Sequence, residues 1–205
     1  MTRKLIFDRF IAVLMLATLL LVGTAHGRDD RPQITFSASL EGDTILTEAR
    51  VDLPVSPALV WMVLTDYAHY PRFISTMRES TVLSRSPTGL LVEQKGSFDF
   101  LFFSQDVAIH LLVSEFPPNV IVARAVEGDF REMLGRYELR AMGSGVRLLY
   151  SGRVIPEFSL PPIIGMKLVQ FALQDNFAQM VDEIMRRQAM AHQTPPPVQR
   201  RANRP

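Results

Sequence analysis

Cysteine is absent from the 205-residue sequence. The folded chain therefore has no disulfide framework, and its stability must come from a hydrophobic core, for which this length is sufficient in one domain. The absence also excludes a cysteine nucleophile. It excludes the lipid-modified cysteine that would follow the apolar leader of a bacterial lipoprotein as well.

Clustered histidines and common catalytic motifs are missing too. The histidines are His26, His69, His110 and His192, and no two of them have metal-ligand spacing on a helix or hairpin. The sequence has neither a Gly-x-Ser-x-Gly nucleophile elbow nor a glycine-rich phosphate loop that leads into a helix. We therefore expect no metal and no cofactor.

Lysine is scarce, and the charge is unevenly distributed. Lys4, Lys95 and Lys167 are the lysines, so 19 of the 22 basic residues are arginines. Residues 28–185 contain 14 basic and 20 acidic side chains, a net charge of −6. A body that acidic does not suit nucleic-acid binding, and we expect no nucleic-acid partner.

Residues 1–27 have the pattern of a secretory signal peptide. Arg3, Lys4 and Arg9 precede 13 uncharged residues, IAVLMLATLLLVG, which is short for a membrane span. The small residues of Ala25-His26-Gly27 then predict cleavage near Gly27 and a periplasmic or secreted protein. The alternative is an uncleaved N-terminal anchor, and in both cases the domain is exported.

The C-terminal segment is rich in proline and arginine. HQTPPPVQRRANRP, residues 192–205, cannot bury an apolar face, and we expect a disordered tail. Its arginines are either solvated or in contact with anionic lipid headgroups. Between leader and tail we expect an N-terminal extension with an edge strand at 28–43 and one domain at 44–191.

Alternating apolar residues predict strands along most of this domain. In TILTEARVDL, Ile45 and Val51 share one side of the strand, whereas Glu48 and Arg50 share the other. Gly42-Asp43, just before it, predicts a two-residue hairpin turn. Similar runs separated by short turns occupy residues 80–86, 90–100, 106–116, 120–126, 131–142 and 146–155. This arrangement favours an antiparallel sheet of about seven strands.

Two short helices and one long helix complete the pattern. Ser56 is a candidate N-cap with Pro57 in the first helical position, and Asp66 is a candidate cap for a second short turn. A long helix is predicted from about Pro161 to Ala191, because an apolar stripe runs through it at helical spacing. The stripe consists of Met166, Val169, Leu173, Phe177, Met180 and Ile184.

The order of these elements is that of a helix-grip fold, and the residues after the first core strand resemble a known family. VDLPVSPALVWMVLTDYAHYPRFISTMRESTVL contains Val60-Trp61, then Leu64 to Tyr67, then Tyr70-Pro71 with Phe73. This stretch resembles the opening of START-like (SRPBCC) domains of the polyketide cyclase/dehydrase and coenzyme Q-binding (COQ10-type) group. The resemblance covers about residues 44–190.

The resemblance implies an α+β fold in which a curved antiparallel sheet wraps around the long C-terminal helix, with an apolar cavity between them. The short helices and strand hairpins would then surround the cavity entrance. Members of the superfamily include carriers of lipids and quinones, cyclases and aromatases, and hormone receptors. The resemblance therefore specifies the fold better than the function.

The most apolar part of the predicted sheet is FDFLFFS, residues 98–104, at a hairpin. By alternation, Gln94, Phe98 and Phe100 face inward, whereas Glu93 faces outward. The turn is capped by Leu101, Phe102 and Phe103. These apolar side chains either close the end of the core, form the mouth of the cavity, or make a peripheral membrane contact.

Polar side chains on inward faces are candidates for orienting a ligand in an apolar pocket. Tyr137 and Tyr150 lie on strand faces that are otherwise apolar; the alternative is a local hydrogen bond at the core boundary. Gly96, Gly135 and Gly152 on such faces either leave room for a ligand or mark bends. The candidate ligand-binding residues are Phe73, Gln94, Phe98, Phe100, Tyr137, Tyr150, Met166, Leu173 and Phe177.

These features predict an exported, monomeric binder or carrier of an apolar small molecule, such as a lipid or an isoprenoid quinone. A cyclase or dehydratase acting in the same cavity is the second hypothesis. Its candidate acid–base residues, Tyr137, Tyr150 and Glu93, are poor ones, because Glu93 alternates outward and tyrosine is a weak base at neutral pH. We therefore assign no catalytic residue. A ligand-free module that docks a membrane or protein through FDFLFFS is the third hypothesis.

Overall fold

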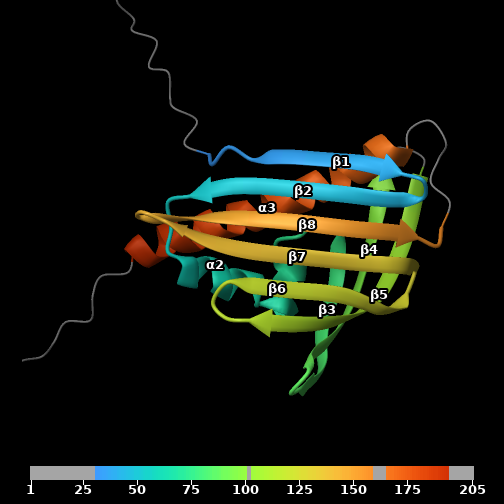
Figure 1. Cartoon of the computed structure of the whole chain (residues 1–205), viewed down its shortest axis with the longest axis horizontal. Helices are drawn as coiled ribbons and strands as arrows, with labels where there is room; N and C mark the ends of the chain where they lie inside the picture. Colours follow the sequence, from blue (N-terminus) through green and yellow to red (C-terminus); the bar gives the residue numbers. More distant parts are fainter. Residues whose placement is uncertain (1–30, 101–102, 159–164, 194–205) are drawn as a thin grey trace, which may run out of the picture. The chain divides into compact units, whose positions relative to one another are not determined.

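The computed structural model describes residues 31–100, 103–158 and 165–193, with the backbone alone at Phe100 and Phe103. Most of the described residues form one eight-stranded antiparallel sheet, and a long helix lies across it (Figure 1). In chain order the elements are β1 (Thr35–Glu41), β2 (Thr44–Leu53), α2 (Pro57–Leu64), η2 (Tyr67–Arg72), β3 (Met77–Ser86), β4 (Gly89–Phe100), β5 (Phe103–Phe116), β6 (Val120–Gly128), β7 (Phe130–Met142), β8 (Gly145–Pro156) and α3 (Gly165–Gln193).

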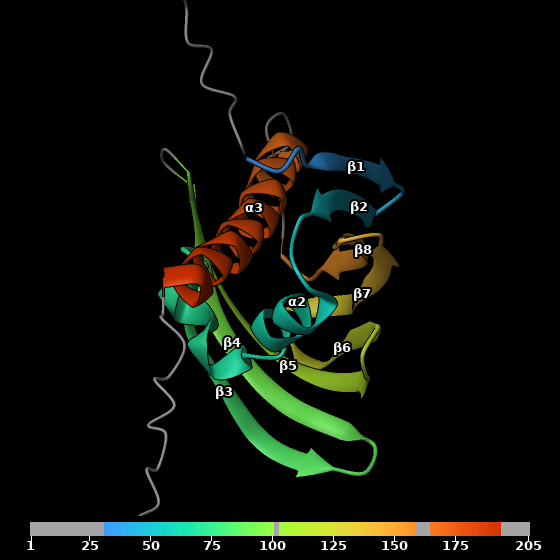
Figure 2. The ribbon, with the colours of Figure 1, turned by 90° about the vertical axis from the view of Figure 1, so that its left-hand side faces the viewer.

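The strands lie in the order β1-β2-β8-β7-β6-β5-β4-β3. From β3 to β8 each strand pairs with the next one along the chain, whereas β2 pairs with the last strand, β8. Because β2 and β3 are far apart in this order, the segment with α2 and η2 carries the chain across one face of the sheet (Figure 2). The β2–β8 pairing places Ile45 opposite Val154.

The strand β1 extends the sheet at the edge beside β2. Glu41 pairs with Thr44, so Gly42-Asp43 forms the predicted two-residue turn, and Gly42 has a φ of 63°, which favours glycine. The eight strands are therefore the predicted edge strand and the seven strands predicted for the domain.

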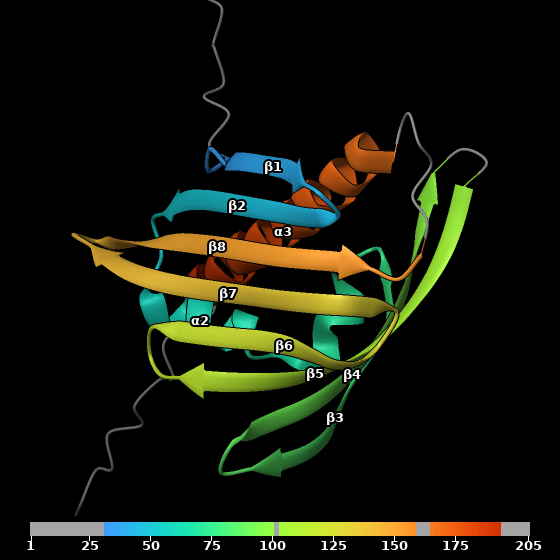
Figure 3. The same ribbon diagram turned by 45° about the vertical axis from the view of Figure 1, so that its right-hand side comes forward.

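The concave face of the curved sheet surrounds α3 (Figures 2 and 3). Register shifts occur in the β3–β4 pair, in β5–β6 after His110 and in β7–β8 after Phe130. Such shifts insert an unpaired residue and bend the strand, so they contribute to the curvature. Together with the long helix, this arrangement confirms the predicted α+β helix-grip fold.

The two short helices after β2 are also present as predicted. Ser56 is the N-cap of α2: its hydroxyl accepts a hydrogen bond from the Leu59 amide at 3.3 Å, and Pro57 follows at the start of the helix. Asp66 occupies the N-cap position of η2 as predicted, but its side chain makes no capping hydrogen bond. The Asp66 carboxylate instead binds side chains on η2 and α3, as described below.

The long helix α3 ends at Gln193, two residues beyond the predicted end, and its predicted start at 161–164 lies outside the described residues. In its C-terminal half the predicted apolar stripe is correct, because Phe177, Met180 and Ile184 are buried. In its N-terminal half the buried positions are Gly165, Leu168 and Ala172 instead. In this half, the buried positions therefore each lie one residue before a position of the predicted stripe.

The main hydrophobic core lies between the sheet, α2 and the C-terminal half of α3. Its most enclosed members include Val63, Leu64, Val92, Leu148 and Ile184. Each such side chain contributes about 1.5–3 kcal/mol through burial. None of the described helices is both long and apolar enough to cross a membrane.

Candidate ligand-binding cavity

A cavity of about 180 Å³ lies between the N-terminal half of α3 and the concave face of the sheet. Leu168, Ala172 and Leu173 line it from the helix. Val107 and Ile109 on β5 line it from the sheet. Most of the lining is therefore apolar, which is typical of sites for small hydrophobic ligands.

Aromatic and proline side chains gather at one end of this cavity. Phe130, at the start of β7, packs edge-to-face against Phe158, with 5.9 Å between ring centroids. Phe98 on β4 and Pro156 on β8 complete this part of the lining. Leu101 and Phe102 lie outside the described residues, and for Phe103 the backbone alone is described. Their predicted membrane contact stays a prediction.

Three of the candidate ligand-binding residues line the cavity: Gln94, Phe98 and Leu173. Met166 and Phe73 do not line it. Phe73 lies beyond η2, against the Tyr70 ring, at 5.6 Å between ring centroids. The side chain of Phe100 lies outside the described part of the chain, so its inward orientation remains a prediction.

The remaining candidates, Tyr137, Tyr150 and Phe177, form an aromatic cluster that does not line the cavity. The ring centroids of Tyr137 and Tyr150 are 4.8 Å apart, and Tyr150 is 6.4 Å from Phe177 on α3. Both tyrosines face inward as predicted. Burial raises the pKa of both phenols, so they stay protonated.

The space that the inward-facing glycines were expected to leave is occupied. A methyl group at Gly135 would meet the Tyr150 ring, and one at Gly152 would overlap the hydroxyls of Tyr150 and Thr47. At Gly96, the backbone carbonyl of Thr76 takes the space. These glycines therefore permit close packing, because their missing side chains make room for neighbours instead of a ligand.

Thr47 is the most deeply buried polar side chain near the cavity. It is 2 % exposed, on the same face of β2 as the cavity-lining Ile45, and its Oγ1 has no hydrogen-bond partner among the residues described. The Thr47 hydroxyl lies near that of Tyr150 and lowers the pKa of Tyr150 against the larger rise that burial causes.

Several lining residues were not predicted, and one pattern could have identified them. Leu168, Ala172 and Asn176 repeat at intervals of four residues and all line the cavity. Residues four apart share one face of a helix, so this second stripe was visible in the sequence. Thr76 and Met77, which precede and begin the edge strand β3, carried no comparable signal.

The outward direction of Glu93 is confirmed. Its carboxylate lies 3.4 Å from both Lys95 Nζ and His110 Nε2 on the convex face of the sheet. The hydrogen bond from His110, more than that from Lys95, lowers the pKa of Glu93. Glu93 therefore cannot act as an acid or base inside the cavity.

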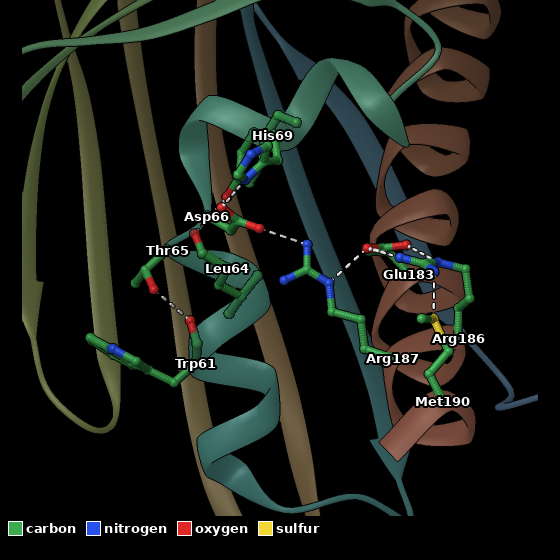
Figure 4. Close-up of polar contacts among 10 residues, drawn as sticks. Trp61, Leu64, Thr65, Asp66, His69, Glu183, Arg186, Arg187 and Met190 are labelled. Atoms are coloured by element: carbon green, nitrogen blue, oxygen red, sulfur yellow. Dashed lines mark hydrogen bonds and ion pairs between the residues drawn. The ribbon is translucent and has the colours of Figure 1, made fainter. Parts of the chain in front are cut away.

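A separate polar network joins η2 to the C-terminal half of α3 (Figure 4). Arg187 lies between two carboxylates, with distances of 2.7 Å to Asp66 Oδ2 and 2.7 Å to Glu183 Oε1. Asp66 also lies 2.5 Å from His69 Nδ1. Arg186 binds Glu183 with two further hydrogen bonds.

The electrostatics of this network favour the charged carboxylates. Burial alone would raise the pKa of Asp66, but the hydrogen bonds from His69 and Arg187 together lower it. The hydrogen bond from Arg186 lowers the pKa of Glu183 in spite of burial, and Arg187 adds to this effect. The ion pair between Asp66 and Arg187 holds the start of η2 against α3.

The comparisons with known proteins agree with this fold. The model of the family described as polyketide cyclase / dehydrase and lipid transport matches residues 53–185, and the chain belongs to this family. No protein with a curated description matches the sequence.

Solved structures with the same fold include a lipid transfer protein and an aromatase/cyclase. A STAR-related lipid transfer protein from Xanthomonas axonopodis is 16% identical with a TM-score of 0.59, over 76% of this chain and 99% of that one. Human STARD10 is 14% identical with a TM-score of 0.60, over 78% of this chain and 72% of that one. The Zhui aromatase/cyclase from a Streptomyces species is 15% identical with a TM-score of 0.56, over 78% of this chain and 98% of that one. At this identity the similarity establishes the fold alone.

Proposed function

We propose that this protein binds and carries an apolar small molecule in the cavity between the sheet and α3. The observation that supports this most directly is the apolar lining, contributed by Leu168, Ala172 and Leu173 on the helix and by Val107 and Ile109 on the sheet. Membership of a family that includes lipid transport is consistent with it.

The size of the cavity limits what it encloses. A dry apolar cavity of about 150 Å³ accommodates a benzene ring. The volume of about 180 Å³ therefore accommodates a ring or a short chain segment. The rest of a lipid or an isoprenoid quinone would extend through the end of the cavity lined by Phe130 and Phe158. The motif from Val60 to Phe73 resembles the coenzyme Q-binding group, so isoprenoid quinones are among the ligands that we propose.

Catalysis by a cyclase or dehydratase has less support from the site. Tyr137 and Tyr150 have raised pKa values and do not line the cavity, and Glu93 lies on the opposite face of the sheet. An acid or base for such chemistry would have to come from the substrate or from outside the described residues. We therefore favour binding over conversion.

We propose that the protein acts outside the cytoplasm. This proposal rests on the basic and apolar pattern of residues 1–27, which lie outside the described part of the chain. N-terminal sequencing of the exported protein tests it. A mature chain that begins near Arg28 is expected, and a full-length chain in the cytoplasm would contradict it.

The carrier function is tested by identifying what the protein retains. The full chain is expressed with export intact, purified without detergent and extracted with organic solvent, and the extract is analysed by mass spectrometry. One class of apolar molecule, at about one per chain, is expected. An empty protein that also fails to take up added apolar probes would overturn the proposal.

A matched pair of variants on α3 locates the binding site. Ala172→Phe places a ring in the cavity and should abolish retention of the molecule, because Ala172 is buried against this space. Ala189→Phe introduces the same ring at an exposed position of the helix and should retain it. Equal retention by both variants would contradict binding in this cavity.

A further inference from the structure

Three polar side chains of the cavity lining lie where α3 faces the start of β3 and the middle of β4. The Thr76 hydroxyl donates to Asn176 Oδ1 at 2.9 Å. Gln94 Nε2 donates to the Ser80 hydroxyl at 3.4 Å. Asn176, Thr76 and Gln94 all line the cavity.

Each of the two side-chain amides, Asn176 and Gln94, has one polar atom without a hydrogen bond. Within the described chain, Asn176 Nδ2 has no acceptor and Gln94 Oε1 has no donor. The two side chains come from different elements, α3 and β4, and both line the cavity. A bound carbonyl or hydroxyl oxygen can accept from Asn176, and a bound hydroxyl can donate to Gln94.

The same lining offers no counter-charge to an ionised group. Lys95 is the one charged residue among the described lining residues. Its Nζ binds Glu79 at 3.1 Å and Glu93 at 3.4 Å, both on the convex face of the sheet. An ionised ligand group would therefore be buried without a partner, which is costly in an apolar environment.

We propose that the cavity selects an uncharged amphipathic molecule whose carbonyl or hydroxyl oxygen is bound by the side-chain amides of Asn176 and Gln94. This inference rests on the proposed carrier function and specifies its ligand class. Asn176 donates to the oxygen, Gln94 accepts from it when it is a hydroxyl, and the apolar remainder packs against Leu168 and Ala172. An ionised head group, such as that of a fatty acid or a phospholipid, is disfavoured at this position of the cavity.

Three probes of equal chain length test the selection: dodecane, dodecan-2-one and dodecanoate at pH 8, each in competition with a fluorescent apolar dye bound to the full chain. The ketone should bind about 3- to 10-fold more tightly than dodecane, as expected for one added hydrogen bond. Dodecanoate, which is ionised at this pH, should bind more weakly than the ketone.

Substitutions identify the residues that recognise the oxygen. Asn176→Leu should remove the preference for the ketone, a loss of about 3- to 10-fold in ketone affinity, and leave the affinity for dodecane unchanged. Gln174→Leu, at an exposed position of the same helix, is the matched control and should retain the preference. Gln94→Leu tests the recognition from β4, with dodecan-1-ol as the probe, independently of any effect of Asn176→Leu on folding.

The outcomes separate this inference from the carrier function on which it rests. Tight binding of dodecanoate, or an unchanged ketone preference in Asn176→Leu together with an unchanged dodecan-1-ol affinity in Gln94→Leu, would overturn the inference while leaving a working apolar cavity. Failure of all three probes to displace the dye would overturn the carrier function itself.

Discussion

At the scale of single residues, the burial of an unpaired hydroxyl is the most informative feature. Thr47 lies in a row of apolar side chains on β2, and its Oγ1 finds no partner among the described residues. A buried hydroxyl without a hydrogen bond costs stability, and proteins rarely contain one without a functional or structural reason. It lies beside Tyr150 and on the same face of β2 as the cavity-lining Ile45.

Thr47→Val removes this hydroxyl while keeping the shape of the side chain. We expect the free energy of unfolding to rise by about 1 kcal/mol, because the unpaired polar atom is replaced by a methyl group. Urea denaturation, with and without the extracted ligand, measures this change in the free energy of unfolding. Thr81→Val, on the exposed side of β3, is the control and should change stability little. A loss of stability in Thr47→Val would indicate that the hydroxyl has a partner such as an ordered water.

At the scale of elements, α3 is held differently along its two halves. Its C-terminal half is linked to η2 through Arg187 and Asp66, and its middle is linked to the start of β3 through Gln179 and Ser75. Its N-terminal half covers the cavity mainly with apolar contacts. The firmly held half therefore positions the half that lines the cavity.

Arg187→Met should destabilise the protein by about 1–3 kcal/mol, because it leaves Asp66 and Glu183 without their shared partner. Arg186→Met is the control: that side chain is 57% exposed, and Glu183 keeps Arg187, so the loss should be smaller. Thermal and urea unfolding at pH 7 measure both effects. Equal losses in the two variants would contradict the linking role of Arg187.

The pH dependence of this variant follows from the two carboxylates. The pKa values of Asp66 and Glu183 are lowered in the folded protein. Their contribution is therefore present above the ordinary carboxyl range and is lost as the pH falls through the lowered values. The stability difference between wild type and Arg187→Met should shrink below about pH 4.

At the scale of the whole described domain, one end of the helix grip is a close-packed core and the other is hollow. Leu148 on β8 is fully enclosed between the sheet and α3, whereas Leu168 borders the cavity. A substitution that creates a void in a packed core costs more than one that enlarges an existing space, because more contacts are lost.

Leu148→Ala should therefore lower the free energy of unfolding by about 2–5 kcal/mol, as in other packed cores. Leu168→Ala should cost about 2 kcal/mol or less, because the side chain already faces a cavity. Urea denaturation of the ligand-free proteins compares them. An equal cost at both positions would mean that the cavity is filled by side chains in solution.

Local sequence patterns determined most of the architecture. The alternation in β2, the Gly42-Asp43 turn and the Ser56 cap each predicted an element correctly, because these preferences depend on neighbouring residues alone. The motif from Val60 to Phe73 indicated the helix-grip fold and the family, since it covers the segment that connects the two ends of the sheet.

The tertiary structure alone decided which inward-facing residues border the cavity. Tyr137 and Tyr150 face inward as predicted, yet Tyr150 fills the space beside Gly152, and the cavity lies one row further along the sheet. On α3, Val169 and Leu173 of the predicted stripe line the cavity, and packing against the curved sheet adds Leu168, Ala172 and Asn176 to the lining. Which row is left uncovered depends on the register of β2 with β8 and on contacts such as Asp66 with Arg187, between residues distant in the chain. Local periodicity assigns a side chain to a face, whereas long-range packing determines what that face contacts.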